Sequence, residues 1–252
     1  MPAPSDIAVV TAGRHDVLAA WLCAWLKSPN AERWPVCIGD DGLFPDAFRE
    51  KAAAVGCTFF DISADLDDAY RFFPDLPRKH AAWSTKVVAM QHCPARWCIW
   101  LDHDCEVTGD IRPIVDFARA SGKWLSAPFY ASFGTNRFSQ TRVTQNGLCI
   151  VDTASSNLAV WRDGFRRFRD SNDETVLPHC FGGMDGVRQN VCDLFRREWY
   201  ASPDVYQSIH RSVPAALLTM SVVKPIALVR HWCSAPGKTM FRQLYPESER
   251  FL

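Results

Sequence analysis

Alternating strand and helix patterns at the start of the chain restrict its fold more than any other feature. Residues 7–11 form a short apolar stretch rich in β-branched side chains, and an amphipathic stretch follows at 16–27. Residues 36–39 and 57–62 predict two further strands, with a helix between them at 45–55. Repeated strand–helix units of this kind build a mostly parallel sheet with helices on both faces. We therefore predict an α/β fold with a Rossmann-like, mostly parallel central sheet flanked by helices.

The remaining chain continues this pattern less regularly. Further helices are predicted at 80–91, 155–169 and 184–197. Further strands are predicted at 97–101, 123–127, 148–151 and 223–231, and a tail that contains glycine and proline follows the last of them. Loops are expected at 65–78 and 129–142, where the apolar period is lost. Since no repeat, low-complexity tract or flexible linker interrupts the sequence, we predict a single domain over residues 1–252.

The composition of the 252 residues excludes several classes of protein. The 28 lysines and arginines balance the 28 aspartates and glutamates, so there is no strong signal for nucleic-acid binding. No apolar run is long enough for a transmembrane segment, and residues 1–6 do not resemble a secretory signal, which predicts a cytoplasmic protein. The ten cysteines show no Cys-x-x-Cys spacing and lie mostly in apolar stretches. We interpret them as small core residues of a protein from a reducing compartment.

Two acids directly follow the apolar segment at 97–101. Asp102 and Asp104 are two residues apart, and in extended backbone such residues project to the same side. Both carboxylates can therefore face one cation at the carboxyl edge of the sheet, where open α/β folds bind ligands. Two oxygen donors suit Mg²⁺ or Mn²⁺, which commonly takes its remaining ligands from phosphate and water. By spacing alone the pair fits a turn or a helix cap equally well.

The segment around this acid pair resembles the Asp-x-Asp segment of GT-A fold glycosyltransferases, notably the group of glycogenin and the bacterial lipopolysaccharide galactosyltransferases. Residues 100–111 read Trp-Leu-Asp-His-Asp-Cys-Glu-Val-Thr-Gly-Asp-Ile. They are similar to the family in the apolar strand, in both acids and in the Val-x-Gly-Asp continuation. The resemblance implies a GT-A type domain in which residues 1–111 form the nucleotide-binding half and residues 112–252 the acceptor-binding half.

Other segments are similar to the family in the same order along the chain. The strand that ends at His231 is similar to a terminal segment in which a histidine completes the metal shell and a lysine, here Lys238, contacts the diphosphate. Asn146 falls in a stretch similar to the strand that borders the donor sugar, although one residue is missing from the family spacing. Asp185 falls in a stretch similar to an acidic segment beside the acceptor, where glycine replaces the usual glutamine.

The resemblance implies a set of site residues. The metal ligands would be Asp102, Asp104 and His231. The residues expected to bind the nucleotide-sugar donor are Thr11, Ala12, Gly13, Arg14, Arg78, Lys86, Asp102, His103 and Lys238, with Asp40 or Asp41 near the base or ribose. The expected catalytic residues are Asp185 and Asn146. Asp185 would be the base of an inverting enzyme, whereas in a retaining enzyme both would orient sugar and acceptor.

These implications predict a metal-dependent glycosyltransferase. It would move a sugar from a nucleotide-diphosphate sugar, with UDP favoured, to an acceptor hydroxyl on an unknown glycan or small molecule. The family resemblance favours retention at the anomeric carbon, and an imidazole ligand favours Mn²⁺ slightly over Mg²⁺. Two alternatives stay open: a metal-dependent nucleotidyltransferase or phosphohydrolase that uses the same acids, and a catalytically silent nucleotide-binding module. The absence of Gly-x-Gly-x-x-Gly and Gly-x-Ser-x-Gly disfavours a dinucleotide site and a serine hydrolase.

Overall fold

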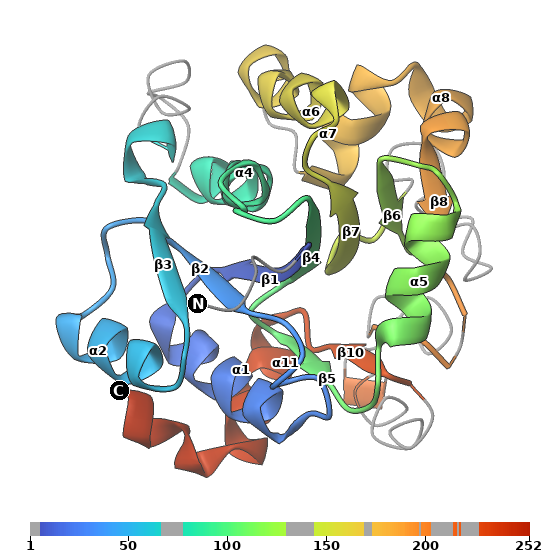
Figure 1. Ribbon diagram of the computed structural model, residues 1–252. Helices are drawn as coiled ribbons and strands as arrows, with labels where there is room; N and C mark the ends of the chain where they lie inside the picture. The colour runs from blue at the N-terminus through green and yellow to red at the C-terminus, as the bar shows by residue number, and fades with distance from the viewer. Residues whose placement is uncertain are drawn as a thin grey trace.

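A seven-stranded sheet forms the centre of the molecule (Figure 1). The computed structural model describes residues 6–66, 78–129, 144–168, 173–196, 198–202, 214–215, 217 and 227–252, without the side chains of 78–83. In this part of the chain the strand order is β3-β2-β1-β4-β7-β6-β8. The strands are β1 (Ile7–Ala12), β2 (Val36–Asp40), β3 (Thr58–Asp61), β4 (Trp97–Leu101), β6 (Leu125–Ala127), β7 (Leu148–Asp152) and β8 (Val191–Asp193).

Most neighbouring strands of this sheet run parallel. Strands β3, β2, β1 and β4 pair in parallel, as do β6 and β8, and only β7 is antiparallel to both of its neighbours among the described strands. Successive residues of β1 face opposite sides, so that Val9 belongs to one buried cluster while Ala8 and Val10 belong to the other. The apolar, β-branched composition of β1 is therefore explained by burial on both faces.

Helices cover both faces of the sheet (Figure 1). On one side lie α1 (His15–Lys27) and α2 (Asp46–Ala54), whose apolar side chains join Val9 in the first cluster. On the other side lie α4 (Arg78–Gln91), α6 (Ser156–Arg167) and α7 (Asp173–Cys180), which pack in the second cluster. Helix α5 (Arg112–Ala120) packs its apolar residues into the first cluster, and α8 (Gly183–Asn190) precedes β8. No helix of the described residues is long and apolar enough to cross a membrane.

A second, three-stranded sheet joins the middle of the chain to its last part. Strand β10 (Val229–His231) runs antiparallel to β5 (Cys105–Val107) and parallel to β9 (Tyr200–Ala201). Helix α11 (Ala235–Leu244) and the 3₁₀ helix η2 (Pro246–Phe251) follow. The buried carboxylate of Glu106 accepts hydrogen bonds from Arg230 at 2.9 Å, from Trp232 at 3.0 Å and from Tyr245 at 2.7 Å. These bonds hold β5, β10 and the end of α11 together.

The fold class predicted from the sequence is confirmed, and two predicted elements are wrong in detail. The helix predicted at 184–197 ends at Asn190, because the next three residues pair with β6 as strand β8. The predicted tail after His231 forms α11 instead. Ser234 caps this helix by accepting a hydrogen bond from the Gly237 N–H, and Pro236 lies in the first turn, where its missing N–H costs nothing. The predicted loops at 65–78 and 129–142 fall largely outside the described residues.

Candidate active site

The acid pair lies at the carboxyl end of β4, where that strand meets β7. The Asp102 N–H donates a hydrogen bond to the Gly147 carbonyl at 2.9 Å, and the Cys105 N–H turns back to the Asp102 carbonyl at 2.8 Å. This turn leaves Asp102 half-buried and Asp104 only 3% exposed. The chain therefore takes Asp104 out of water, which requires partners for its charge.

His231 supplies one of those partners from the far end of the sequence. Pairing of β10 with β5 places His231 opposite Cys105, and the Trp232 N–H donates to the Asp104 carbonyl at 2.8 Å. The Nε2 atom of His231 lies 3.1 Å from Asp104 Oδ1 and 3.5 Å from Asp102 Oδ2. Lys238 Nζ lies 3.3 Å from Asp104 Oδ2. Burial acts to raise the pKa of Asp104, but His231 and Lys238 hold it well below its usual range, so the group is a carboxylate.

The donor atoms of these residues fit a divalent metal ion. Among the described residues, Asp104, Cys105 and His231 form a group whose ligand atoms lie within 4.8 Å of one another. Burial raises the pKa of Cys105 far above its usual value, and its thiol donates a hydrogen bond to the Gly147 carbonyl at 3.2 Å. Asp102 Oδ2 lies 3.5 Å from the Nε2 atom of His231, so Asp102 is a further candidate ligand. Two carboxylates and one imidazole suit Mn²⁺ and also accept Mg²⁺.

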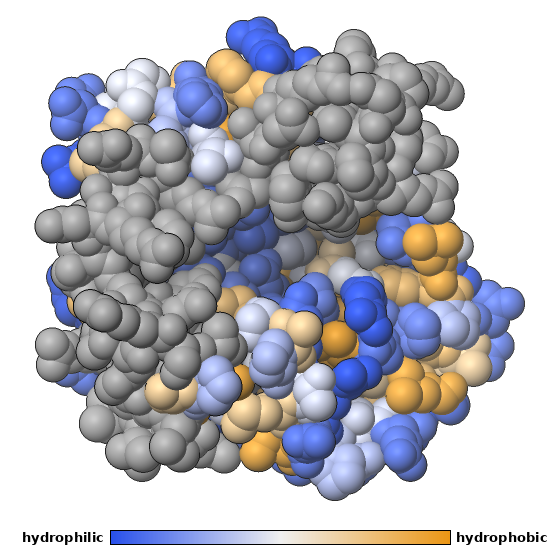
Figure 2. All heavy atoms as spheres, turned by 180° about the vertical axis from the view of Figure 1, so that it is seen from behind, coloured by the Kyte–Doolittle hydropathy of each residue, from blue (hydrophilic) through white to orange (hydrophobic). Residues whose placement is uncertain are grey.

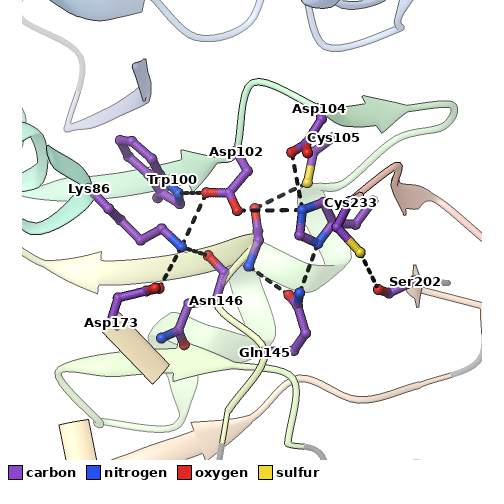
Figure 3. A network of polar contacts seen from close by, with 12 residues as sticks. Lys86, Trp100, Asp102, Asp104, Cys105, Gln145, Asn146, Asp173, Ser202 and Cys233 are labelled. Atoms are coloured by element: carbon purple, nitrogen blue, oxygen red, sulfur yellow. Dashed lines mark hydrogen bonds and ion pairs between the residues drawn. The ribbon is translucent and has the colours of Figure 1, made fainter. Parts of the chain in front are cut away.

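A buried lysine of α4 connects the acid pair to the start of α7. Lys86 of α4 places Nζ 3.2 Å from Asp102 Oδ1, 2.8 Å from Asp173 Oδ2 and 2.7 Å from the Asn146 carbonyl (Figure 3). Burial acts to lower the pKa of Lys86, but Asp102 and Asp173 raise it above its usual range. The ammonium charge of Lys86 is therefore fixed beside Asp102, one of the candidate metal ligands. Trp100 Nε1 donates to Asp102 Oδ1 at 2.6 Å and further restricts that carboxylate.

These groups line one cavity of about 910 Å³. Its wall is made by the turns that follow β1, β2 and β4, together with parts of α4, α7, β10 and α11. Figure 2 shows one face of the molecule hollowed near its middle, where the visible side chains are mostly hydrophilic. A cavity of this size at the carboxyl ends of parallel strands is where α/β folds bind ligands, and it has room for a nucleotide sugar.

The turn after β1 lies against the acid pair. A Cβ atom added at Gly13, which has a φ of +144°, would lie 2.3 Å from the His103 imidazole. Only glycine suits both this backbone angle and this close approach. Burial lowers the pKa of His103, so its imidazole is neutral at pH 7. The turn after β1 and the acid pair therefore form one continuous part of the cavity wall.

Most of the residues expected from the sequence come together in this cavity. It is lined by Ala12, Gly13, Arg14, Lys86, Asp102, His103, Asp104, His231 and Lys238. Thr11 is fully buried in β1 and does not line the cavity. Of the two acids after β2, Asp41 lines the cavity, whereas Asp40 forms an ion pair with Arg49. Arg78 begins α4, but its side chain lies outside the described residues.

The two expected catalytic residues are not placed in the cavity. Asp185 lies in the first turn of α8 with its side chain 90% exposed and 3.9 Å from Arg188. Asn146 is buried, and it is its backbone carbonyl, not its amide, that contacts Lys86. Neither residue is among those that line the cavity. The sequence similarity implies that Asp185 lies beside the acceptor. In the structure the carboxylate of Asp185, at the start of α8, is exposed to solvent.

Gln145, Asp173 and Glu174 are among the polar residues that line the cavity and were not predicted as site residues from the sequence. Gln145 precedes β7 and lies one residue closer to the amino terminus than Asn146; choosing it would have removed the missing residue from the family spacing. Asp173 and Glu174 form the first turn of α7, a helix that was not predicted. Two acids at the start of an apolar stretch were the available signal for that helix start.

The arrangement of strands and helices is the GT-A fold, which is found in glycosyltransferases. Among solved structures, the chain is similar to the galactosyltransferase LgtC in complex with donor and acceptor sugar analogues, with a TM-score of 0.59, 16% identity and coverage of 95% of both chains. It is also similar to the glycosyltransferase GlyE of Streptococcus pneumoniae TIGR4, with a TM-score of 0.60 and 11% identity over 96% of this chain and 64% of that one. Mouse xyloside xylosyltransferase 1 matches with a TM-score of 0.53 and 14% identity over 89% of this chain and 97% of that one. No protein family model and no curated protein sequence matches.

Proposed function

We propose that this protein is a metal-dependent glycosyltransferase that moves a sugar from a nucleotide-diphosphate sugar, with UDP favoured, to a hydroxyl of a glycan or small molecule. The observation that carries the proposal is the convergence of Asp102 Oδ2, Asp104 Oδ1 and His231 Nε2, with Lys238 beside them, on one cavity. The GT-A fold supports it, as does the complex of LgtC with sugar analogues of donor and acceptor. Ten free cysteines fit a cytoplasmic location.

The charges of the cavity suit departure of a nucleoside diphosphate. A divalent ion held by Asp102, Asp104 and His231, most favourably Mn²⁺, would offset the negative charge that grows on the leaving diphosphate. Lys238 adds a fixed positive charge next to Asp104. The turn after β1, with Ala12, Gly13 and Arg14, offers a surface for the nucleotide. Because these groups are held by packing and hydrogen bonds before substrate binds, little reorganisation is needed during the reaction.

We assign the sugar-facing and acceptor-facing roles to residues of α7. Asp173 and Glu174 line the cavity, and Asp173 is held by Lys86, which also contacts the metal ligand Asp102. Glu174 is the carboxylate we expect to orient the acceptor hydroxyl, because it lines the cavity, whereas Asp185 does not. With retention, a departing phosphate oxygen takes the acceptor proton, and no separate base is required.

A screen of nucleotide sugars tests the proposal. The full chain is incubated with UDP and GDP sugars, with and without Mn²⁺, and release of the nucleoside diphosphate is measured. We expect metal-dependent hydrolysis of one donor, lost in Asp104→Asn, and thermal stabilisation by that donor only with Mn²⁺. Turnover of a nucleoside triphosphate or a simple phosphate ester without any sugar nucleotide would indicate a nucleotidyltransferase or phosphohydrolase. No response to nucleotide and metal would indicate a silent module.

A further inference from the structure

The imidazole of His231 is held by a polar cluster on the side away from the acid pair. Its Nδ1 atom lies 2.9 Å from the Gln145 amide nitrogen and 2.8 Å from the Tyr200 hydroxyl oxygen. The Gln145 carbonyl oxygen accepts hydrogen bonds from the Gly147 N–H at 2.7 Å and from the Tyr200 hydroxyl. Gln145, Tyr200 and His231 are each at most 4% exposed. Buried polar groups connected in this way fix one another's orientation.

The backbone is arranged to admit this cluster. Strand β9 pairs in parallel with β10, which brings Tyr200 beside His231. A Cβ atom added at Gly147 would lie 2.5 Å from His231 Nδ1 and 2.6 Å from the Tyr200 hydroxyl. The missing side chain at this position therefore makes room for the ring and the hydroxyl together. Figure 3 shows Gln145 directed toward the group of metal ligands from the side opposite Asp102 and Asp104.

We propose that Gln145 and Tyr200 are positioning residues that fix the ring plane of His231, and that Tyr200 accepts the Nδ1 proton in the form of the ring that leaves Nε2 for the metal. This inference rests on the metal site of the proposed function. A neutral imidazole that binds a metal through Nε2 carries its proton on Nδ1, and that proton needs an acceptor. The Gly147 N–H fixes the Gln145 amide with its nitrogen toward Nδ1, so Gln145 presents a donor there. The Tyr200 oxygen presents the acceptor, while its own proton goes to the Gln145 carbonyl.

The two residues therefore favour different forms of the ring. The Gln145 amide favours a proton on Nε2, which then donates to Asp104 Oδ1 at 3.1 Å. Tyr200 favours a proton on Nδ1, which leaves the Nε2 lone pair for the metal. A glutamate at position 145 would change the first of these preferences, because a carboxylate accepts the Nδ1 proton itself.

Mn²⁺ binding to the full chain without nucleotide tests this inference, with unbound Mn²⁺ measured by electron paramagnetic resonance. We expect Tyr200→Phe to weaken Mn²⁺ binding about 10- to 100-fold, as loss of a partner behind a ligating histidine does. Tyr245→Phe is the matched control, since it also deletes a tyrosine hydroxyl that is hydrogen-bonded to a buried group, here Glu106, away from His231. It should bind Mn²⁺ as the unchanged protein does. Adding Gln145→Glu to Tyr200→Phe should restore binding.

The outcomes separate the inference from the proposed function. Equal Mn²⁺ affinities for Tyr200→Phe and Tyr245→Phe, or no rescue by Gln145→Glu, would overturn the inference. If Asp104→Asn also binds Mn²⁺ unchanged, the metal site itself and the proposed function fail. If circular dichroism shows that Tyr200→Phe does not fold, the single variant Gln145→Glu is compared with the unchanged protein instead. Tighter Mn²⁺ binding by this variant supports the inference, and weaker or equal binding refutes it.

Discussion

Replacing Lys86 by methionine removes the cation that separates two buried carboxylates. Lys86 Nζ lies 2.8 Å from Asp173 and 3.2 Å from Asp102, and the lysine and both aspartate side chains are at most 22% exposed. At an effective dielectric constant of 20, each pair contributes roughly 5 to 6 kcal/mol of Coulomb energy, offset in large part by the cost of taking the charges out of water. Breaking a buried pair on one side costs about 3–5 kcal/mol in comparable cases. We therefore expect Lys86→Met to lower the free energy of unfolding by that amount.

Urea unfolding followed by circular dichroism measures this change. Lys51→Met is the matched control, because Lys51 is exposed on α2, and it should change the free energy of unfolding by less than about 0.5 kcal/mol. Adding Asp173→Asn to Lys86→Met should recover part of the loss, since one of the two unpaired charges is removed. A loss below about 1 kcal/mol for Lys86→Met, or no recovery in the double variant, would show that the charges are solvated and that the reasoning is wrong.

Three further predictions concern the site and the cysteines. Gly147→Ala should weaken Mn²⁺ binding at least about tenfold in titration calorimetry, because the new methyl group would lie 2.5 Å from His231 Nδ1; unchanged affinity would contradict the tight packing there. Asp185→Asn should change kcat/KM for donor hydrolysis less than about twofold, as expected for an exposed side chain, and an inactive variant would return the catalytic role to Asp185. A hydrogen bond with Cys98 lowers the pKa of Cys93, whereas burial raises that of Cys180 to about 11, so at pH 8 Cys93 carries more thiolate and should react first with iodoacetamide. Mass spectrometry that finds Cys180 modified first would refute this order.

The fold of the first hundred residues was predictable because its signals are local. Strand β4 matches the prediction at both ends, and β1, α1, β2 and α2 match within one or two residues. Each is an apolar or amphipathic stretch bounded by turn residues, and each buries the side chains that define it. The acid pair was predictable for the same reason, since its spacing and the preceding strand are both visible in the sequence.

The rest of the site depends on contacts between distant segments. Gln145 lines the cavity because β7 runs antiparallel to β4, and Tyr200 lies beside His231 because β9 joins β10. Neither pairing leaves a pattern within its own short strand. Asp185 is the opposite case, because a local similarity suggested a site residue, whereas its side chain is 90% exposed and does not line the cavity, so its role stays a prediction. Strand β8 was predicted as part of a helix, because its three residues continue an apolar pattern that also suits a helix.

The residues of the proposed metal site are divided between an early and a late part of the polypeptide. Asp102 and Asp104 follow a strand in the first half, whereas His231 reaches them only through β10, which pairs with β5. During synthesis, both aspartates leave the ribosome long before the histidine does. A nascent chain therefore cannot assemble the full set of proposed ligands, and we expect metal binding only in the finished protein.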